Sequence, residues 1–93
     1  MDRLLNVIPS TRKTKRFKAV FKQGRTTHFG LKNPVYGTYI DHGDDQKRNN
    51  YIARHSAMES WNNPYTPATL SRYILWEKKE LSEAIKAYNK RFF

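Results

Sequence analysis

The chain has 93 residues, no cysteine, and 18 Lys and Arg against eight Asp and Glu, which gives a net charge of +10. That length allows one domain with one modest core, and the lack of cysteine excludes disulfides and thiolate metal sites. The apolar patch at residues 4–8 is too short for a signal sequence, and no apolar run approaches the roughly 20 residues that span a bilayer. We therefore expect a chain without a signal sequence or transmembrane segment.

The positive charge is concentrated near the N-terminus. Residues 1–32 hold nine basic residues and one acidic residue, whereas residues 33–93 hold nine and seven. Such asymmetry is typical of a surface that binds a polyanion. Residues 1–14 contain most of the polar stretch "PSTRKTKR" (residues 9–16), which has too few apolar residues to order by itself. We expect them to form a basic N-terminal arm ahead of one compact domain over residues 15–93.

A β-hairpin is predicted over about residues 15–30. In "RFKAVFK" the apolar and basic residues alternate, which predicts a strand with a buried face and a basic outer face. Gln23 and Gly24 then indicate a turn, and "RTTHFG" is the return strand. The inner face would carry Phe17, Ala19 and Phe21, and the outer face Arg16, Lys18 and Lys22.

Two or three helices follow the hairpin, over about residues 45–61, 67–77 and 80–92. Asp44 or Asp45 is expected to cap the first helix, and Thr66 followed by Pro67 is typical of the start of the second. Leu81, Ile85, Tyr88 and Phe92 share the spacing of one helical face in the third. A short strand over residues 35–40 is a further expectation. The predicted fold class is a small α+β domain.

The stretch "YIARHSAMESW" carries the most unusual residues of the central helix. Helical spacing places four of them on one inner seam: Tyr51, His55, Met58 and Trp61. We expect His55 to pair with Glu59 four residues further on. Arg54 lies off this seam, where it could meet a partner or an acidic residue of the preceding loop, Asp41 or Asp44. These residues read as a structural signature rather than an active site.

The basic residues around the first strand are the candidate contacts to a polyanion or protein partner. They are Arg12, Lys13, Lys15, Arg16, Lys18, Lys22 and Arg25. Such side chains bind phosphates without reading base sequence. Exposed aromatic residues could stack on unpaired bases, but a domain this small needs its aromatic residues for its core.

Few residues suggest chemistry. His42, Asp44 and His55 are a conceivable metal-ligand set, and scattered His and Asn residues make a small metal-dependent nuclease a remote alternative. No glycine-rich phosphate loop is present, and no serine has an evident base beside it. We therefore expect a protein that is not an enzyme, with no catalytic residue, cofactor, bound metal or small-molecule substrate.

Several short motifs occur in a characteristic order: "HFG" at 28–30, "YIDHGD" at 39–44, "YIARH" at 51–55, "ESW" at 59–61 and "LSRYILW" at 70–76. In these motifs and their spacing the chain resembles a family of short basic proteins of uncharacterised function from large double-stranded DNA viruses of eukaryotes, chloroviruses and giant viruses among them. The resemblance covers about residues 15–93 and leaves residues 1–14 outside. Its matching positions include Tyr51, Arg54, His55, Glu59, Trp61 and Trp76.

The resemblance implies a virion or a viral-replication context and brings no catalytic residues. The leading expectation is a minor capsid protein that bridges or stabilises the shell from inside, with other capsid proteins as partners. The alternative is a nucleic-acid-binding protein that condenses or packages viral DNA. The expected location is the inner side of the capsid, and the host cytoplasm or nucleus during assembly.

Overall fold

The computed structural model of the protein describes residues 1–32 and 37–93. Three strands come first, β1 (Leu4–Pro9), β2 (Lys15–Phe21) and β3 (Thr26–Leu31), and they form one antiparallel sheet in the order β1-β2-β3. The helical segments follow as α1 (Tyr39–His42), α2 (Asp45–Ser56), α3 (Pro67–Leu70), the π-helical segment η1 (Ser71–Leu75) and α4 (Leu81–Phe92). The predicted α+β class is confirmed.

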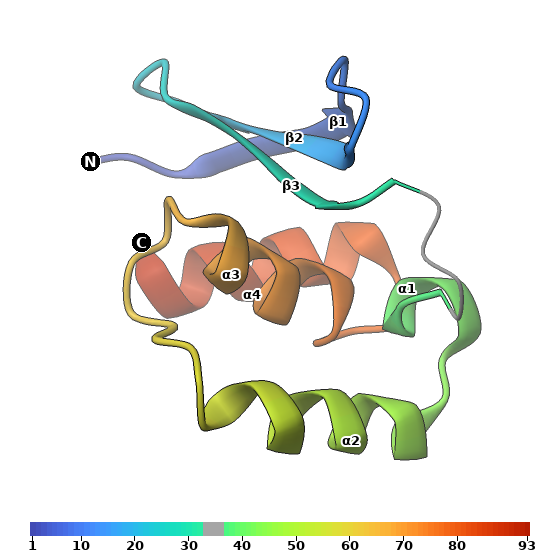
Figure 1. Ribbon diagram of the computed structural model, residues 1–93. Helices are drawn as coiled ribbons and strands as arrows, with labels where there is room; N and C mark the ends of the chain where they lie inside the picture. The colour runs from blue at the N-terminus through green and yellow to red at the C-terminus, as the bar shows by residue number, and fades with distance from the viewer. Residues whose placement is uncertain (33–36) are drawn as a thin grey trace.

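The elements form three layers (Figure 1). The sheet lies on one side, α3, η1 and α4 lie against it, and α2 lies beyond them on the far side. The core fills the space between the sheet and the middle layer, where Leu4, Phe21 and Phe29 of the sheet meet Leu70 and Tyr88 of the helices. Each of these five side chains is almost completely buried. The helices cover one face of the sheet, and in the described part of the chain no element covers the other.

The predicted hairpin is confirmed. Phe17 lies opposite Phe29 and Ala19 lies opposite Thr27 across β2 and β3. Because side chains alternate between the two faces of a strand, Phe17, Ala19 and Phe21 all point toward the helices. Gly24 closes the turn with φ +96°, a conformation that glycine adopts without steric cost.

The expected separate N-terminal arm is wrong. Residues 4–9 form β1, an edge strand in register with β2, and the Leu4 side chain lies in the core. The Asn89 side-chain amide of α4 accepts a hydrogen bond from Leu4 N at 2.7 Å and donates one to Leu4 O at 2.9 Å. Residues 4–9 are ordered by backbone pairing with β2 and by these two hydrogen bonds with Asn89, because they are too few to order alone. The sheet therefore continues across the predicted boundary at residue 14.

The predicted helices are present with different boundaries. Asp44 caps α2 as expected, with its carboxylate accepting from the N–H groups of Gln46 and Lys47. The expected end at residue 61 is wrong, because the N–H groups of Met58 and Glu59 both bond His55 O and close the helix early. The predicted strand over residues 35–40 falls partly outside the described residues. Of its remaining positions, residues 39 and 40 belong to α1.

The second predicted helix is divided into two kinds of helix. Thr66 caps α3 and Pro67 occupies its first turn, as the sequence predicted. From Ser71 onward the chain is π-helical, a rare geometry that frequently occurs at functional sites. The expected single helix over 67–77 is therefore corrected to α3 followed by η1, and the third predicted helix is confirmed as α4.

Candidate polyanion-binding site

The sheet's outer face is the face that the helices leave uncovered. Strand register places Ile8, Lys18 and His28 side by side in one row across all three strands. A second row contains Asn6, Val20 and Thr26. Lys22 is exposed in the turn that directly follows Phe21, at the end of β2. We use "outer face" for these seven residues.

The β1–β2 loop, residues 10–14, adds cations beside this face. Ser10 Oγ lies 2.6 Å from His28 Nδ1 and accepts a hydrogen bond from Arg12 N at 3.0 Å, which fixes the loop against the end of the sheet. The side chains of Arg12 and Lys13 are exposed. Partial burial lowers the pKa of His28, and the nearby charges of Arg12 and Lys18 lower it further. The potential at His28 is therefore positive.

Asp2, the one acidic residue among residues 1–32, does not offset the positive charge of the outer face. The Asp2 carboxylate is buried and accepts hydrogen bonds from Tyr65 OH at 2.6 Å and Gln23 N at 3.0 Å. The hydrogen bond from Tyr65 holds the pKa of Asp2 below its usual value. Asp2 stabilises the fold as an anion on the inner side, and the outer face and its loop contain no acidic residue.

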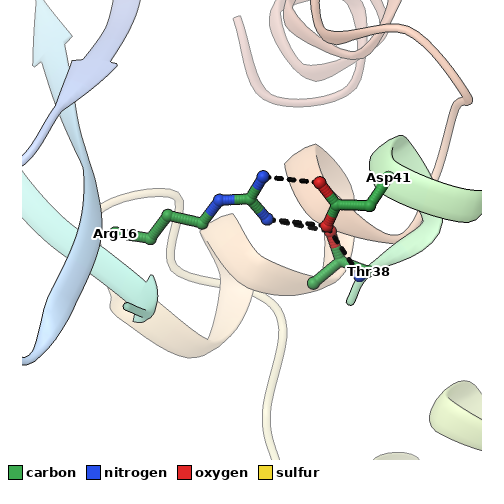
Figure 2. A network of polar contacts seen from close by, with 3 residues as sticks. All are labelled: Arg16, Thr38 and Asp41. Atoms are coloured by element: carbon green, nitrogen blue, oxygen red, sulfur yellow. Dashed lines mark hydrogen bonds and ion pairs between the residues drawn. The ribbon is translucent and has the colours of Figure 1, made fainter. Parts of the chain in front are cut away.

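Arg16 has a structural role. Its guanidinium forms a bidentate ion pair with Asp41 of α1, with N–O distances of 2.6 and 2.7 Å, as Figure 2 shows. Asp41 also accepts hydrogen bonds from the backbone N–H and the hydroxyl of Thr38, each at 2.7 Å. The Arg16 hydrogen bonds hold the pKa of Asp41 far below its usual range. Arg16 thereby ties β2 to the start of α1 and is not free to contact a phosphate.

The other predicted contact residues also divide between two sides of the sheet. Lys15 lines a cavity on the helical side. Arg25 lies over the Tyr65 ring, with its guanidinium carbon 4.2 Å from the ring centroid. Four of the seven predicted cations thus remain on or beside the uncovered side of the sheet, with Lys18 within β2, Arg12 and Lys13 in the loop before it and Lys22 in the turn after it.

The signature residues form a cluster on α2 and the segment that follows it. His55 Nδ1 and Glu59 Oε1 are 2.7 Å apart, which confirms the predicted pair, and Trp61 Nε1 donates to the other Glu59 oxygen at 2.9 Å. The predicted inner seam is only partly right, because the Met58 side chain is 79% exposed and Trp61 lies outside the helix. Arg54 is exposed and forms no ion pair with a described residue.

The three residues that the sequence offered as a conceivable metal-ligand set, His42, Asp44 and His55, do not form a metal site. His42 Nδ1 accepts a hydrogen bond from Asp44 N at 2.9 Å, and the Asp44 carboxylate caps α2. Among residues 1–32 and 37–93, no three His, Asp or Glu side chains lie close enough together to hold a metal ion. Within the same residues, no helix combines the length and apolar character that crossing a membrane requires.

The sequence did not predict a cavity of about 630 Å³, which the sheet lines with Lys15 at the start of β2 and Leu31 at the end of β3. Tyr51 stacks between His55 and Trp76, with ring centroids 4.2 and 4.4 Å away, and all three rings line this cavity. Burial raises the pKa of Tyr51 to about 12, and the charge of Glu59 contributes to the increase. The helical spacing of Tyr51 and His55 indicated a shared face, but Trp76 comes from a distant segment.

The fold and this site define a small basic α+β protein with an uncovered, cationic sheet face. The chain belongs to DUF5754, a family of unknown function whose model matches residues 5–55. The match spans the sheet, α1 and most of α2, so it includes residues 5–14, which the sequence resemblance left outside. No curated protein and no solved structure matches the chain.

Proposed function

We propose that the protein binds the phosphate backbone of nucleic acid through the sheet's outer face and the β1–β2 loop. The observation that carries this proposal is that Lys18 lies on the uncovered face of the sheet, with Arg12 and Lys13 in the loop at one end of β2 and Lys22 in the turn at the other end. None of the four forms an ion pair with a described acidic residue. Cations in this arrangement neutralise phosphates and release counterions, without a requirement for a particular base sequence.

The electrostatics of His28 support the same reading. Its pKa is lowered, first by partial burial and then by Arg12 and Lys18, so the ring is predominantly neutral near pH 7. A neutral His28 in contact with Ser10 contributes hydrogen-bonding groups rather than a further charge. The charge of the site therefore comes from Lys and Arg, and we expect binding to change little between pH 7 and pH 9.

The test is the salt dependence of binding to random-sequence duplex DNA, followed by fluorescence anisotropy. A variant with Arg12, Lys13, Lys18 and Lys22 all changed to Gln should bind much more weakly. Each phosphate contact contributes about −0.9 to the slope of log K against log salt concentration, so the variant's slope should be shallower by up to about 3.6. Folding of the variant is checked by circular dichroism.

The matched control removes four charges from the helical elements and their connection, with Lys47, Lys78, Lys79 and Lys86 changed to Gln. All four side chains are exposed and lie away from the outer face. We expect this control to retain most of the slope, because general attraction by net charge is weaker than direct contact. Equal losses in the two variants, or no binding by the unmodified protein, would refute the proposal.

A structural role in a virion is a second proposal. It is supported by the resemblance to basic proteins of large DNA viruses and by exposed apolar side chains on both edge strands, Leu5 of β1 (51% exposed) and Leu31 of β3 (73% exposed). Such positions bury apolar area when another capsid protein packs against an edge. A minor capsid protein should remain with the emptied shell, in fixed stoichiometry to the major capsid protein. Recovery with the released DNA would contradict that role.

A further inference from the structure

The 630 Å³ cavity is separate from the outer face but joined to it by a row of cations. Lys15 is paired with Leu31 across β2 and β3, and both residues line the cavity. Arg12 and Lys13 lie in the loop just before Lys15, beside the outer face. Arg54 of α2 lines the cavity on its helical side. Cations therefore lie both in the loop beside the outer face and in the wall of the cavity.

Apolar and polar groups occupy different parts of the cavity wall. Leu31, Ala68 and Leu75 contribute apolar surface from β3, α3 and η1. The polar part includes Ser71 and the hydrogen-bonded pair of His55 and Glu59. A flat ligand with apolar faces and a hydrogen-bonding edge matches such a wall, and the volume lies within the range of small-molecule sites.

Two backbone segments that line the cavity, at Gly30 and in η1, have irregular conformations. Gly30, which lines the cavity, has φ +79°, and a Cβ at this position would lie 3.1 Å from Leu75 Cδ1. Ser71 and Leu75, the first and last residues of η1, both line the cavity. Segments of π-helix are frequent at functional sites.

We infer that the cavity receives one unpaired nucleotide of a bound nucleic-acid strand. The base lies against the apolar wall with its edge toward His55 and Ser71, and the adjoining phosphates lie between Lys15 and Arg54. The charge complementarity of these two cations with a phosphate, next to the loop cations, selects a nucleotide over an uncharged flat ligand. Both faces of Tyr51 are covered by neighbouring rings, so we expect the base to meet the edge of this stack.

This inference rests on the proposed nucleic-acid binding and predicts a preference for single strands. The experiment compares a labelled single-stranded 12-mer with a duplex of the same sequence by anisotropy. Ala68→Leu narrows the cavity and Arg54→Gln removes a rim charge. Each should weaken single-strand binding at least about fivefold, the lower end of what contacts to one base contribute, and leave duplex affinity within about twofold.

Matched controls lie on the same helix as Arg54. Lys47→Gln removes one exposed charge, and Ala53→Leu adds the same bulk at an exposed site outside the cavity. Both should bind single strands like the unmodified protein. If the outer-face variant loses duplex binding while the cavity variants bind both forms normally, the inference fails and the proposed function stands. If the outer-face variant retains full binding, the proposed function itself fails.

Competition by a free mononucleotide tests whether the cavity binds a nucleotide of a strand or a free nucleotide. Adenosine or thymidine monophosphate at millimolar concentration should displace the single strand from the unmodified protein and compete less well in the Ala68→Leu variant. If no mononucleotide competes, the cavity is not a nucleotide site. If a mononucleotide binds the unmodified protein but Ala68→Leu leaves strand binding unchanged, the cavity binds free nucleotides, which overturns the inference about a strand. Arg54 is exposed, so the Arg54→Gln variant keeps the test informative if Ala68→Leu fails to fold.

Discussion

Removing the Asn89 side chain tests whether the N-terminal residues are part of the folded domain. The amide forms hydrogen bonds of 2.7 and 2.9 Å with the N–H and C=O of Leu4, whose side chain is fully buried. Asn89→Ala leaves both backbone groups without these partners, and a buried unsatisfied group costs about 1–3 kcal/mol. We expect a loss of about 2–4 kcal/mol in the free energy of unfolding, a large share of the roughly 5–14 kcal/mol typical of a domain of this size.

Urea unfolding followed by circular dichroism measures this loss directly, and the melting temperature should fall by roughly 10–30 °C. Asn49→Ala is the control, because Asn49 is exposed on α2 and surface substitutions usually change stability by less than about 0.5 kcal/mol. A loss below about 1 kcal/mol for Asn89→Ala, or one no larger than the control's, would show that residues 1–9 are not held by α4.

Three further substitutions probe the core, the backbone and the ion pair between β2 and α1. Leu4→Ala should destabilise the protein by about 2–5 kcal/mol, measured by urea unfolding, because it opens a cavity in a fully buried position. Gly30→Ala should lower the melting temperature more than Gly24→Ala does. Both glycines have positive φ, but only a Cβ at residue 30 meets another side chain, Leu75 Cδ1 at 3.1 Å. Equal melting temperatures of the two variants would contradict this. Asp41→Asn should make the stability of the fold less sensitive to acid, because the folded-state pKa of Asp41 lies far below the ordinary value of 3.8. The charged carboxylate therefore contributes its full stabilisation above pH 3.8, and this stabilisation is lost as the pH falls toward the folded-state pKa of Asp41. Parallel stability–pH curves for the two proteins below about pH 4 would refute this prediction.

The elements predicted correctly are those whose signals are local. Alternating side chains and a Gln-Gly turn were sufficient for the hairpin, and Asp44 and Thr66 marked the starts of α2 and α3. The end of α2 was misplaced because it depends on two N–H groups sharing the His55 carbonyl, a detail of hydrogen bonding that side-chain spacing does not encode. The π-helical geometry of η1 is likewise absent from any propensity.

The elements that were missed depend on contacts distant in sequence. Residues 4–9 are too few to order alone. Their strand exists because β2 pairs with them and because Asn89, 85 positions after Leu4, hydrogen-bonds both backbone groups of Leu4. The cavity is also a product of tertiary structure, since Tyr51 of α2 and Trp76, which follows η1, have ring centroids 4.4 Å apart. Sequence spacing identified only the contact between Tyr51 and His55, which lie on the same helix, and not the contact with Trp76.

The distinction between arginine and lysine explains why net charge overestimates the binding surface. Arg16, Arg48 and Arg72 form ion pairs with Asp41 or Glu77, and Arg25 and Arg91 lie over the rings of Tyr65 and Tyr73. A planar guanidinium suits such contacts, whereas an ammonium group is more strongly hydrated and is kept at the surface. The outer face with Lys18 and Lys22, and the β1–β2 loop with Arg12 and Lys13, therefore carry charge that forms no ion pair within the described fold. Five arginines are engaged within the fold in this way, although Arg12 and Arg54 stay exposed, and a count of basic residues in the sequence does not distinguish the two groups.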